Sequence, residues 1–178
     1  MRNNNIVLVL FFSIIMLAWN VLLAQETAIK KGTYVVKDIT YEVGAPSRYG
    51  STPIWRRDIP KLKPNREFVD NIALDYIETK VTNHEMWRNR VKAVLGKTKQ
   101  DALSRAGERL ILRFEFSPDG KILNIAFSVK TGTVLTLADI ASIDRDLRKN
   151  YIATFSSLDN GHKHLYWIAI NGELDFAK

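Results

Sequence analysis

The sequence predicts an α+β fold in which an antiparallel sheet is covered by helices, and three observations lead to this expectation. Residues 109–129 alternate apolar and polar side chains on both sides of a Ser-Pro-Asp-Gly turn, which is the pattern of a β-hairpin. Residues 137–150 place apolar side chains at helical spacing, and residues 162–170 form a closing apolar stretch typical of a strand. A two-stranded hairpin alone is marginal in water, so we expect the helix to cover its apolar face.

Residues 1–24 are predicted to be a secretory signal peptide. Arg2 precedes an apolar run over residues 6–23, and the small Ala24 stands before polar sequence. Cleavage between Ala24 and Gln25 would leave residues 25–178 as a single exported domain in the periplasm or outside the cell. The run is also long enough to span a bilayer, so an uncleaved anchor is the alternative, and a membrane contact is expected only in that case.

The composition limits the classes of function. The chain has no cysteine and a formal net charge of +7. Export without cysteine excludes disulfides and thiol chemistry, and it fits a bacterial periplasm. No phosphate loop, Gly-x-Ser-x-Gly or HExxH motif occurs, so no cofactor is expected and no motif supports an enzyme. Export argues against a nucleic-acid partner, and the sequence does not determine the oligomeric state.

A strand and a long loop are expected in the first part of the exported chain. Residues 33–43 alternate in the manner of a half-buried strand. Residues 44–65 hold four of the five prolines, and proline fixes φ and lacks a backbone donor, so a loop is expected there. The candidate partner-binding residues of this loop are aromatic or basic: Tyr49, Trp55, Arg56 and Arg57. The alternative is a loop whose aromatic side chains fold back onto the core.

Two helices are expected next. Apolar residues recur at helical spacing over residues 65–81 and again over residues 83–95. Asn83 is expected to cap the second helix, and Gly96 is expected to end it. Polar residues 97–108 are expected to contain a short helical turn. The segment 33–95 thus holds a strand, a proline-rich loop and two helices.

The C-terminal half has clear local signals for the ends of its elements. Gly120 suits the end of the hairpin turn because glycine accepts a positive φ. Thr136 with Asp139 three residues later resembles a capping box at the start of the helix. Asn171 and Gly172 are expected to form a turn that ends the last strand.

Several motif residues of this half follow one another in an order that is also found in one known family: Ala102, Gly107, Arg113-Phe114, Asp119-Gly120-Lys121 and Leu135 to Asp139. In this order residues 98–172 resemble the C-terminal domain of TonB. The resemblance implies a TonB-C-like strand–strand–helix–strand unit over residues 98–178. It also implies that an edge strand near residues 163–170 takes up a partner's strand.

The chain departs from TonB in several respects. No proline-rich spacer follows residue 24, the N-terminal segment has no histidine, and the Tyr-Pro pair before Ala102 is absent. Residues 33–95 are an additional segment. A membrane-anchored, TonB-like transducer therefore stays an alternative that requires residues 6–23 to be retained. The whole chain also resembles short uncharacterised secreted proteins of Bacteroidetes, and that resemblance implies no activity.

Two classes of function remain open. The first is an exported, non-enzymatic protein-binding or adaptor module, with Tyr166 and Trp167 of the last expected strand as further candidate contacts. The second is a hydrolase or metal-dependent enzyme whose site combines acidic residues with His162 and His164. Alternate residues of a strand share a face, so these two imidazoles would point the same way, with Asp159 nearby. The competing interpretation of both histidines is an exposed or hydrogen-bonded core position.

Overall fold

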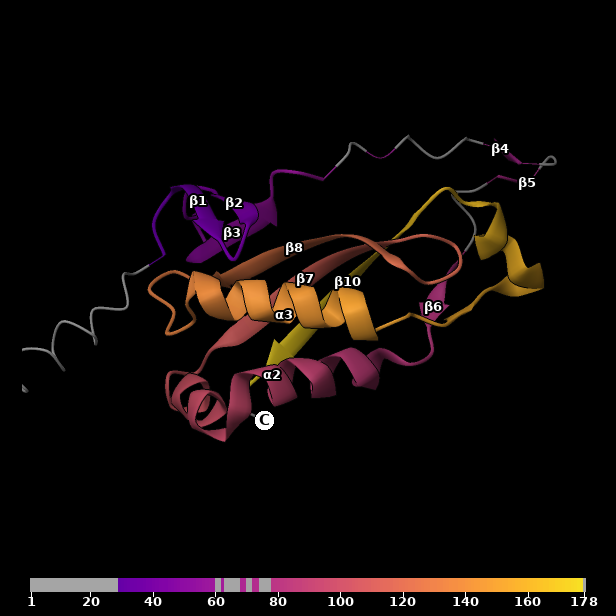
Figure 1. Ribbon diagram of the computed structural model, residues 1–178. Helices are drawn as coiled ribbons and strands as arrows, with labels where there is room; N and C mark the ends of the chain where they lie inside the picture. The colour runs from indigo at the N-terminus through magenta and orange to yellow at the C-terminus, as the bar shows by residue number, and fades with distance from the viewer. Residues whose placement is uncertain (1–28, 60–61, 63–67, 70–71, 74–77, 178) are drawn as a thin grey trace, which may run out of the picture.

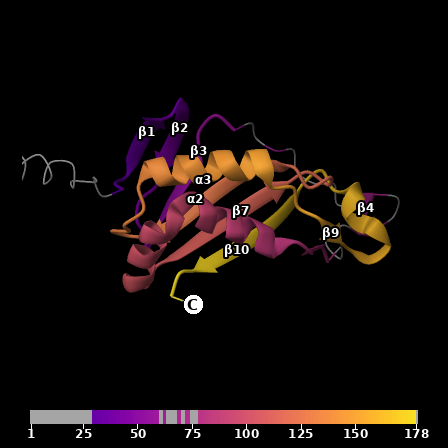
Figure 2. The ribbon, with the colours of Figure 1, turned by 60° about the horizontal axis from the view of Figure 1, so that its bottom comes forward.

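The computed structural model of the protein describes residues 29–59, 62, 68–69, 72–73 and 78–177. Within these residues, two long helices lie on one face of a six-stranded antiparallel sheet in the order β1-β2-β3-β8-β7-β10 (Figure 1, Figure 2). This arrangement confirms the predicted α+β fold class. The predicted signal peptide and its cleavage site lie outside the described residues. None of the helices in the described part is long and apolar enough to cross a bilayer.

The predicted hairpin forms the centre of the sheet. Strands β7 (Arg109–Phe116) and β8 (Ile122–Lys130) pair in one register from Leu110 opposite Val129 to Glu115 opposite Asn124, and a shift of one residue then places Phe116 opposite Ile122. The Gly120 amide donates to the Ser117 carbonyl at 2.9 Å, and Gly120 takes a φ of +86°. The alternating sequence and its glycine-containing turn therefore form the hairpin as expected.

The predicted strand over residues 33–43 is instead a second hairpin. Strands β1 (Gly32–Val36) and β2 (Ile39–Val43) pair with each other. Lys37 and Asp38 connect them with φ values of 51° and 67°. Two successive residues of positive φ reverse the chain in a tight turn. The prediction was wrong because alternation continues through this turn and Lys-Asp is not a usual turn pair.

The predicted loop over residues 44–65 contains a strand. Strand β3 (Ser51–Arg56) lies between β2 and β8 and joins the two halves of the chain in one sheet. Pro53 is tolerated because it stands at the end of the pairing with β2, where the Gly44 amide donates to the Pro53 carbonyl at 2.9 Å, so no bond is lost from the middle of that ladder. Proline content therefore predicted a loop where a proline-containing strand forms.

The predicted helix over residues 65–81 is wrong where the structure describes this segment. Strands β4 (Phe68–Val69) and β5 (Ile72–Ala73) pair with each other. Strand β6 (Lys80–Val81) pairs with β9 (Phe155–Ser156). Short apolar runs satisfy helical spacing and a pair of short strands equally well, so periodicity alone does not separate them. The rest of the predicted helix lies outside the described residues.

Two long helices cover the sheet. Helix α2 (His84–Arg105) is interrupted at Gly96, which has φ 68° and ψ 165°, so the predicted helix end is followed by a second helical stretch. Helix α3 (Leu137–Asn150) begins with the predicted capping box. The Asp139 amide donates to Thr136 Oγ1 at 3.1 Å, and the Thr136 amide donates to Asp139 Oδ2 at 2.9 Å.

The C-terminal strand is displaced from its predicted position. Residues Leu158–His164 form a 3₁₀-helix, and β10 (Ile168–Asp175) follows it. His162 and His164 therefore do not share a strand face. Asn171 and Gly172 lie within β10 and form no turn. Gly172 is required for packing, because a Cβ at this position would stand 2.7 Å from Cζ2 of Trp87.

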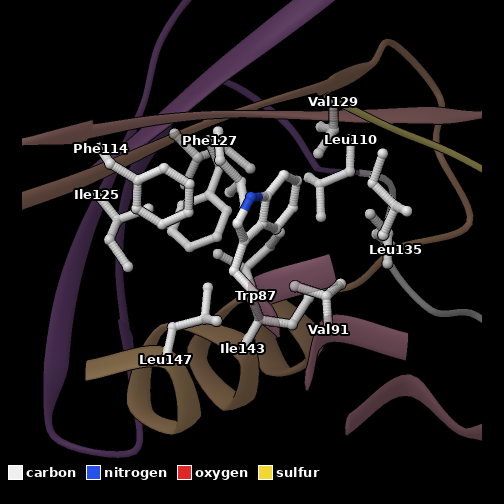
Figure 3. Packing of buried hydrophobic residues seen from close by; sticks show 14 of the residues in the cluster. Trp87, Val91, Leu110, Phe114, Ile125, Phe127, Val129, Leu135, Ile143 and Leu147 are labelled. Carbon is white, nitrogen blue, oxygen red and sulfur yellow. The ribbon is translucent and has the colours of Figure 1, made fainter. Parts of the chain in front are cut away.

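The hydrophobic core lies between the sheet and the two helices (Figure 3). The Trp87 ring from α2 lies 5.6 Å from the Phe114 ring in an edge-to-face arrangement, and Phe114 stacks on Phe116 at 5.2 Å. Ile143 and Leu147 from α3 are fully buried in the same cluster. This packing fixes α2 next to β7 and β10.

Candidate functional site at the edge of the sheet

Strand β10 ends the sheet on one side, and β1 ends it on the other (Figure 2). The Phe176 amide donates to the Glu108 carbonyl at 3.2 Å, which continues the pairing of β10 with β7. Backbone groups of alternate residues in an antiparallel strand point to opposite sides. The even-numbered residues of β10 therefore face β7, and the backbone groups of Ala169, Asn171 and Glu173 face outward.

Arg88 from α2 covers part of this outward edge. Its Nε donates to the Glu173 carbonyl oxygen at 3.1 Å. This bond confirms that the carbonyl of Glu173 points away from β7. Side chains that cap an edge strand block uncontrolled pairing with other chains. In the described part of the chain, the outward groups of Ala169 and Asn171 have no such cover.

A pocket of about 400 Å³ lies beside β10 on the helix-covered side of the sheet. Ile170, Asn171 and Gly172 form its wall on the β10 side, and β6 contributes together with the residue before it, Thr79. The remaining lining is mostly aromatic and comes from α2, β7 and the residue after α3: Trp87, Phe114, Phe116 and Tyr151. The pocket therefore joins a free strand edge to an aromatic cluster.

Charged side chains surround the mouth of this pocket. Arg88 and His84 share one acidic partner, because Glu85 Oε1 lies 2.6 Å from Arg88 Nη1 and 3.2 Å from His84 Nε2. Lys80 reaches the same rim from β6 and lies 3.1 Å from Glu78. The rim thus presents three basic side chains close to the apolar wall.

The segment after α3 is held against the start of α2 by Asn83. Asn83 forms no cap bond with its own helix, contrary to the prediction. Its Nδ2 donates to the Ile152 carbonyl at 2.9 Å, and its Oδ1 accepts from the Thr154 amide at 3.0 Å. Burial raises the pKa of the neighbouring Tyr151 to about 12. The side chain of Asn83 was therefore needed for tertiary contacts, which sequence spacing does not reveal.

A larger groove of about 840 Å³ lies along α2. Its polar lining includes Arg90, whose guanidinium donates two hydrogen bonds of 2.7 Å to the Asp146 carboxylate of α3. The charges of Arg90 and Asp146 are therefore already paired with each other, and the groove lies open to solvent along the helix. We therefore place the candidate site at the β10 pocket, where a strand edge and an apolar surface meet.

The predicted metal candidates occupy a different environment from the one expected. His162 is only 6% exposed, its Nδ1 lies 2.7 Å from Ser157 Oγ, and its backbone amide donates to the same oxygen at 3.0 Å. Burial, with the charge of Lys163, lowers the pKa of His162. Asp159 and His164 are exposed. Among the described residues, no group of three or more potential ligands is arranged around a common point.

The predicted partner-binding residues lie in several places. Tyr49 is 79% exposed beside Arg48 in the β2–β3 connection, and Trp55 is 37% exposed on the face of the sheet opposite the helices. Arg57 and Tyr166 are exposed, and Trp167 is half-buried just before β10. Arg56, in contrast, points to α3.

Arg56 belongs to a buried ionic network that the sequence did not indicate. Asp144 of α3 is fully buried, and its carboxylate lies 3.4 Å from Arg56 and 2.9 Å from Arg148. The Tyr41 hydroxyl donates to it at 3.2 Å, and burial together with this carboxylate raises the pKa of Tyr41. A hydrogen bond from Arg56 lowers the pKa of Asp58. The network connects α3 to β2 and β3, and none of its residues lines the β10 pocket.

These elements define an α+β protein whose sheet is covered on one face and ends in a strand beside an aromatic pocket. Its fold is similar to that of a DUF5043 family protein from Bacteroides uniformis ATCC 8492. The TM-score is 0.60 at 16% sequence identity, and the match covers 82% of this chain and 85% of that chain. No family model and no curated protein matches the chain. The likeness shows the fold alone, and its source agrees with the predicted resemblance to Bacteroidetes proteins.

Proposed function

We propose that this protein is an exported, non-enzymatic module that captures an extended segment of a protein partner by strand addition to β10. One observation carries the proposal: β10 ends the described sheet with the backbone groups of Ala169 and Asn171 directed outward. An extended peptide that pairs with such an edge gains main-chain hydrogen bonds along its length. The edge lies a few residues beyond the segment 163–170 that the sequence predicted.

Two sequence features support this function. The resemblance of residues 98–172 to the TonB C-terminal domain implies strand capture near the C-terminus, and residues 1–24 have the build of a signal peptide. The hydrolase alternative needs His162, His164 and Asp159 at one site, whereas His162 is buried and bonded to Ser157 and the other two residues are exposed. The transducer alternative depends on residues 6–23, which lie outside the described part.

Selection of peptides tests strand addition. We would select random linear peptides displayed on phage against the folded protein and measure the affinity of the selected peptides. Asn171→Pro removes one outward N–H and spares the bonds to β7, so affinity is expected to fall about tenfold. Val35→Pro is the matched control, because Val35 lies on the opposite edge strand with its backbone directed outward. Equal binding to both folded variants would refute the proposal.

The export part of the proposal has its own measurement. The intact mass of the protein from periplasmic and membrane fractions distinguishes a chain that starts at Gln25 from one that starts at Met1. A soluble chain starting at Gln25 is expected. A full-length chain in the membrane would contradict cleavage and favour the anchored transducer.

A further inference from the structure

A strand that pairs with β10 would place its side chains in two sets. Side chains alternate between the two faces of a sheet, so every second residue of the added strand lies on the helix-covered face. On that face its neighbours are the side-chain positions of Ile170 and Gly172. The pocket of about 400 Å³ lies beside these two residues. One side chain of the added strand would therefore be directed into it.

Gly172 and Trp87 form one wall of the pocket. Glycine is required at position 172, because a Cβ there would stand 2.7 Å from Cζ2 of Trp87. The lining also includes Phe114, Phe116 and Tyr151, which contact one another with ring centroids 5.2 to 6.2 Å apart. An aromatic guest ring would extend this cluster through edge-to-face contacts, which aromatic pairs prefer.

The charges at the rim indicate the chemistry next to that ring. His84, Arg88 and Lys80 line the pocket, and the chain as a whole carries a formal charge of +7. Glu85 pairs with both His84 and Arg88, and its side chain is 66% exposed. A carboxylate on the ligand would reach the same two basic groups from the pocket side, and the long-range field favours its approach.

From these observations we infer that the segment added to β10 carries an aromatic side chain that enters the pocket and a carboxylate that pairs with Arg88 at its rim. This inference rests on the proposed function and specifies the partner: an extended peptide with an aromatic residue close to an acidic one. Hydrogen bonds to the backbone edge provide affinity for any extended peptide, and the pocket provides specificity for the peptide's sequence.

Substitutions of single side chains test the pocket without altering the backbone edge of β10. Ile170→Phe is expected to fill the pocket from β10 and to weaken binding of the selected peptides about tenfold. Ile111→Phe is the matched control, because Ile111 is exposed on the opposite face of the sheet. Arg88→Gln is expected to remove the preference for peptides with an acidic residue and to keep the preference for an aromatic one. Thermal unfolding shows which variants remain folded.

A small probe separates the pocket from the edge. Phenylacetate carries a ring and a carboxylate. When it binds, it is expected to shift the NMR signals of the Trp87 indole N–H and the Gly172 amide. Benzyl alcohol lacks the charge and is the control, which is expected to bind more weakly. If peptides bind in an Asn171-dependent way but show no aromatic preference and tolerate Ile170→Phe, this inference is wrong and strand addition stands. If phenylacetate binds and no peptide does, the pocket takes a small aromatic acid, and both the inference and strand addition are wrong.

Discussion

Gly172 of β10 lies directly against the indole of Trp87, at a point where a Cβ would stand 2.7 Å from the ring. This close approach lets α2 pack onto the edge strand of the sheet, and both residues line the candidate pocket. One contact therefore determines both the position of the helix and the shape of the candidate site.

Gly172→Ala is expected to destabilise the protein by about 1–3 kcal/mol, because the added methyl group overpacks a filled core. Urea unfolding provides the free energy. Trp87→Phe removes part of the indole, so the double variant should be more stable than the sum of the two single changes predicts, by about 1 kcal/mol. Additive effects would contradict the close contact.

Asp144→Asn is expected to cost about 3 kcal/mol. The change leaves Arg56 and Arg148 near a buried site without their shared charge, and an unpaired buried charge is expensive. Asp58→Asn is the control, since Asp58 is 50% exposed and pairs with Arg56 at the surface. We expect this second change to cost less than about 1 kcal/mol. Equal losses of stability would contradict the larger contribution expected of the buried carboxylate.

The Arg90–Asp146 pair between α2 and α3 is expected to make stability sensitive to acid. Hydrogen bonds from Arg90 hold the pKa of Asp146 below its ordinary value of 3.8. A lowered folded-state pKa contributes stability that is fully present above pH 3.8 and is lost as the pH falls through the folded-state value. Urea unfolding at a series of pH values measures this slope.

Asp146→Asn should flatten that slope below pH 3.8, and Arg90→Gln should do so as well, because it removes the cause of the lowered pKa. An unchanged slope in both variants would mean that other carboxylates control the acid response.

Gly120→Ala is expected to be among the most damaging single-methyl changes in the chain. Gly120 has a φ of +86°, and a Cβ there would lie 1.9 Å from the Ala153 carbonyl oxygen. We expect a loss of at least about 3 kcal/mol, or failure to fold. Gly132→Ala is the matched control, because Gly132 has a φ of +75° with nothing within 4 Å of the added carbon. It should cost only the conformational strain, about 1 kcal/mol. Similar losses in both variants would rule out the steric explanation.

Local sequence signals were sufficient for the elements whose ends are set by neighbouring residues. The hairpin of β7 and β8 follows from alternation and from Gly120, and α3 follows from apolar spacing and the Thr136–Asp139 capping box. The first part of helix α2 was also predicted, from Asn83 to Gly96, although Gly96 interrupts the helix and does not end it. In each case the hydrogen bonds that define the element are made within about four residues or across one tight turn.

Tertiary contacts decided the candidate site. The TonB resemblance implied an edge strand near residues 163–170, whereas β10 spans Ile168–Asp175. Sequence patterns treated Gly172 as part of a turn, because its contact with Trp87 is made across 85 positions of the chain. The candidate partner residues Tyr49 and Trp55 are exposed, as a partner-binding role requires. Arg56, in contrast, pairs with the buried carboxylate of Asp144 on α3. No local pattern marks such a partner, because Asp144 occupies an ordinary helical position in the sequence.

The sequence by itself determined the fold class, the central hairpin and the two helices that cover it, since alternation, helical spacing and end signals act over short distances. Only the tertiary structure decided that β3 joins the sheet through a proline-containing strand, that β10 becomes its edge, and that an aromatic pocket opens beside Gly172. These features depend on which distant surfaces meet, and the free energy of burial that selects them is shared across the whole core.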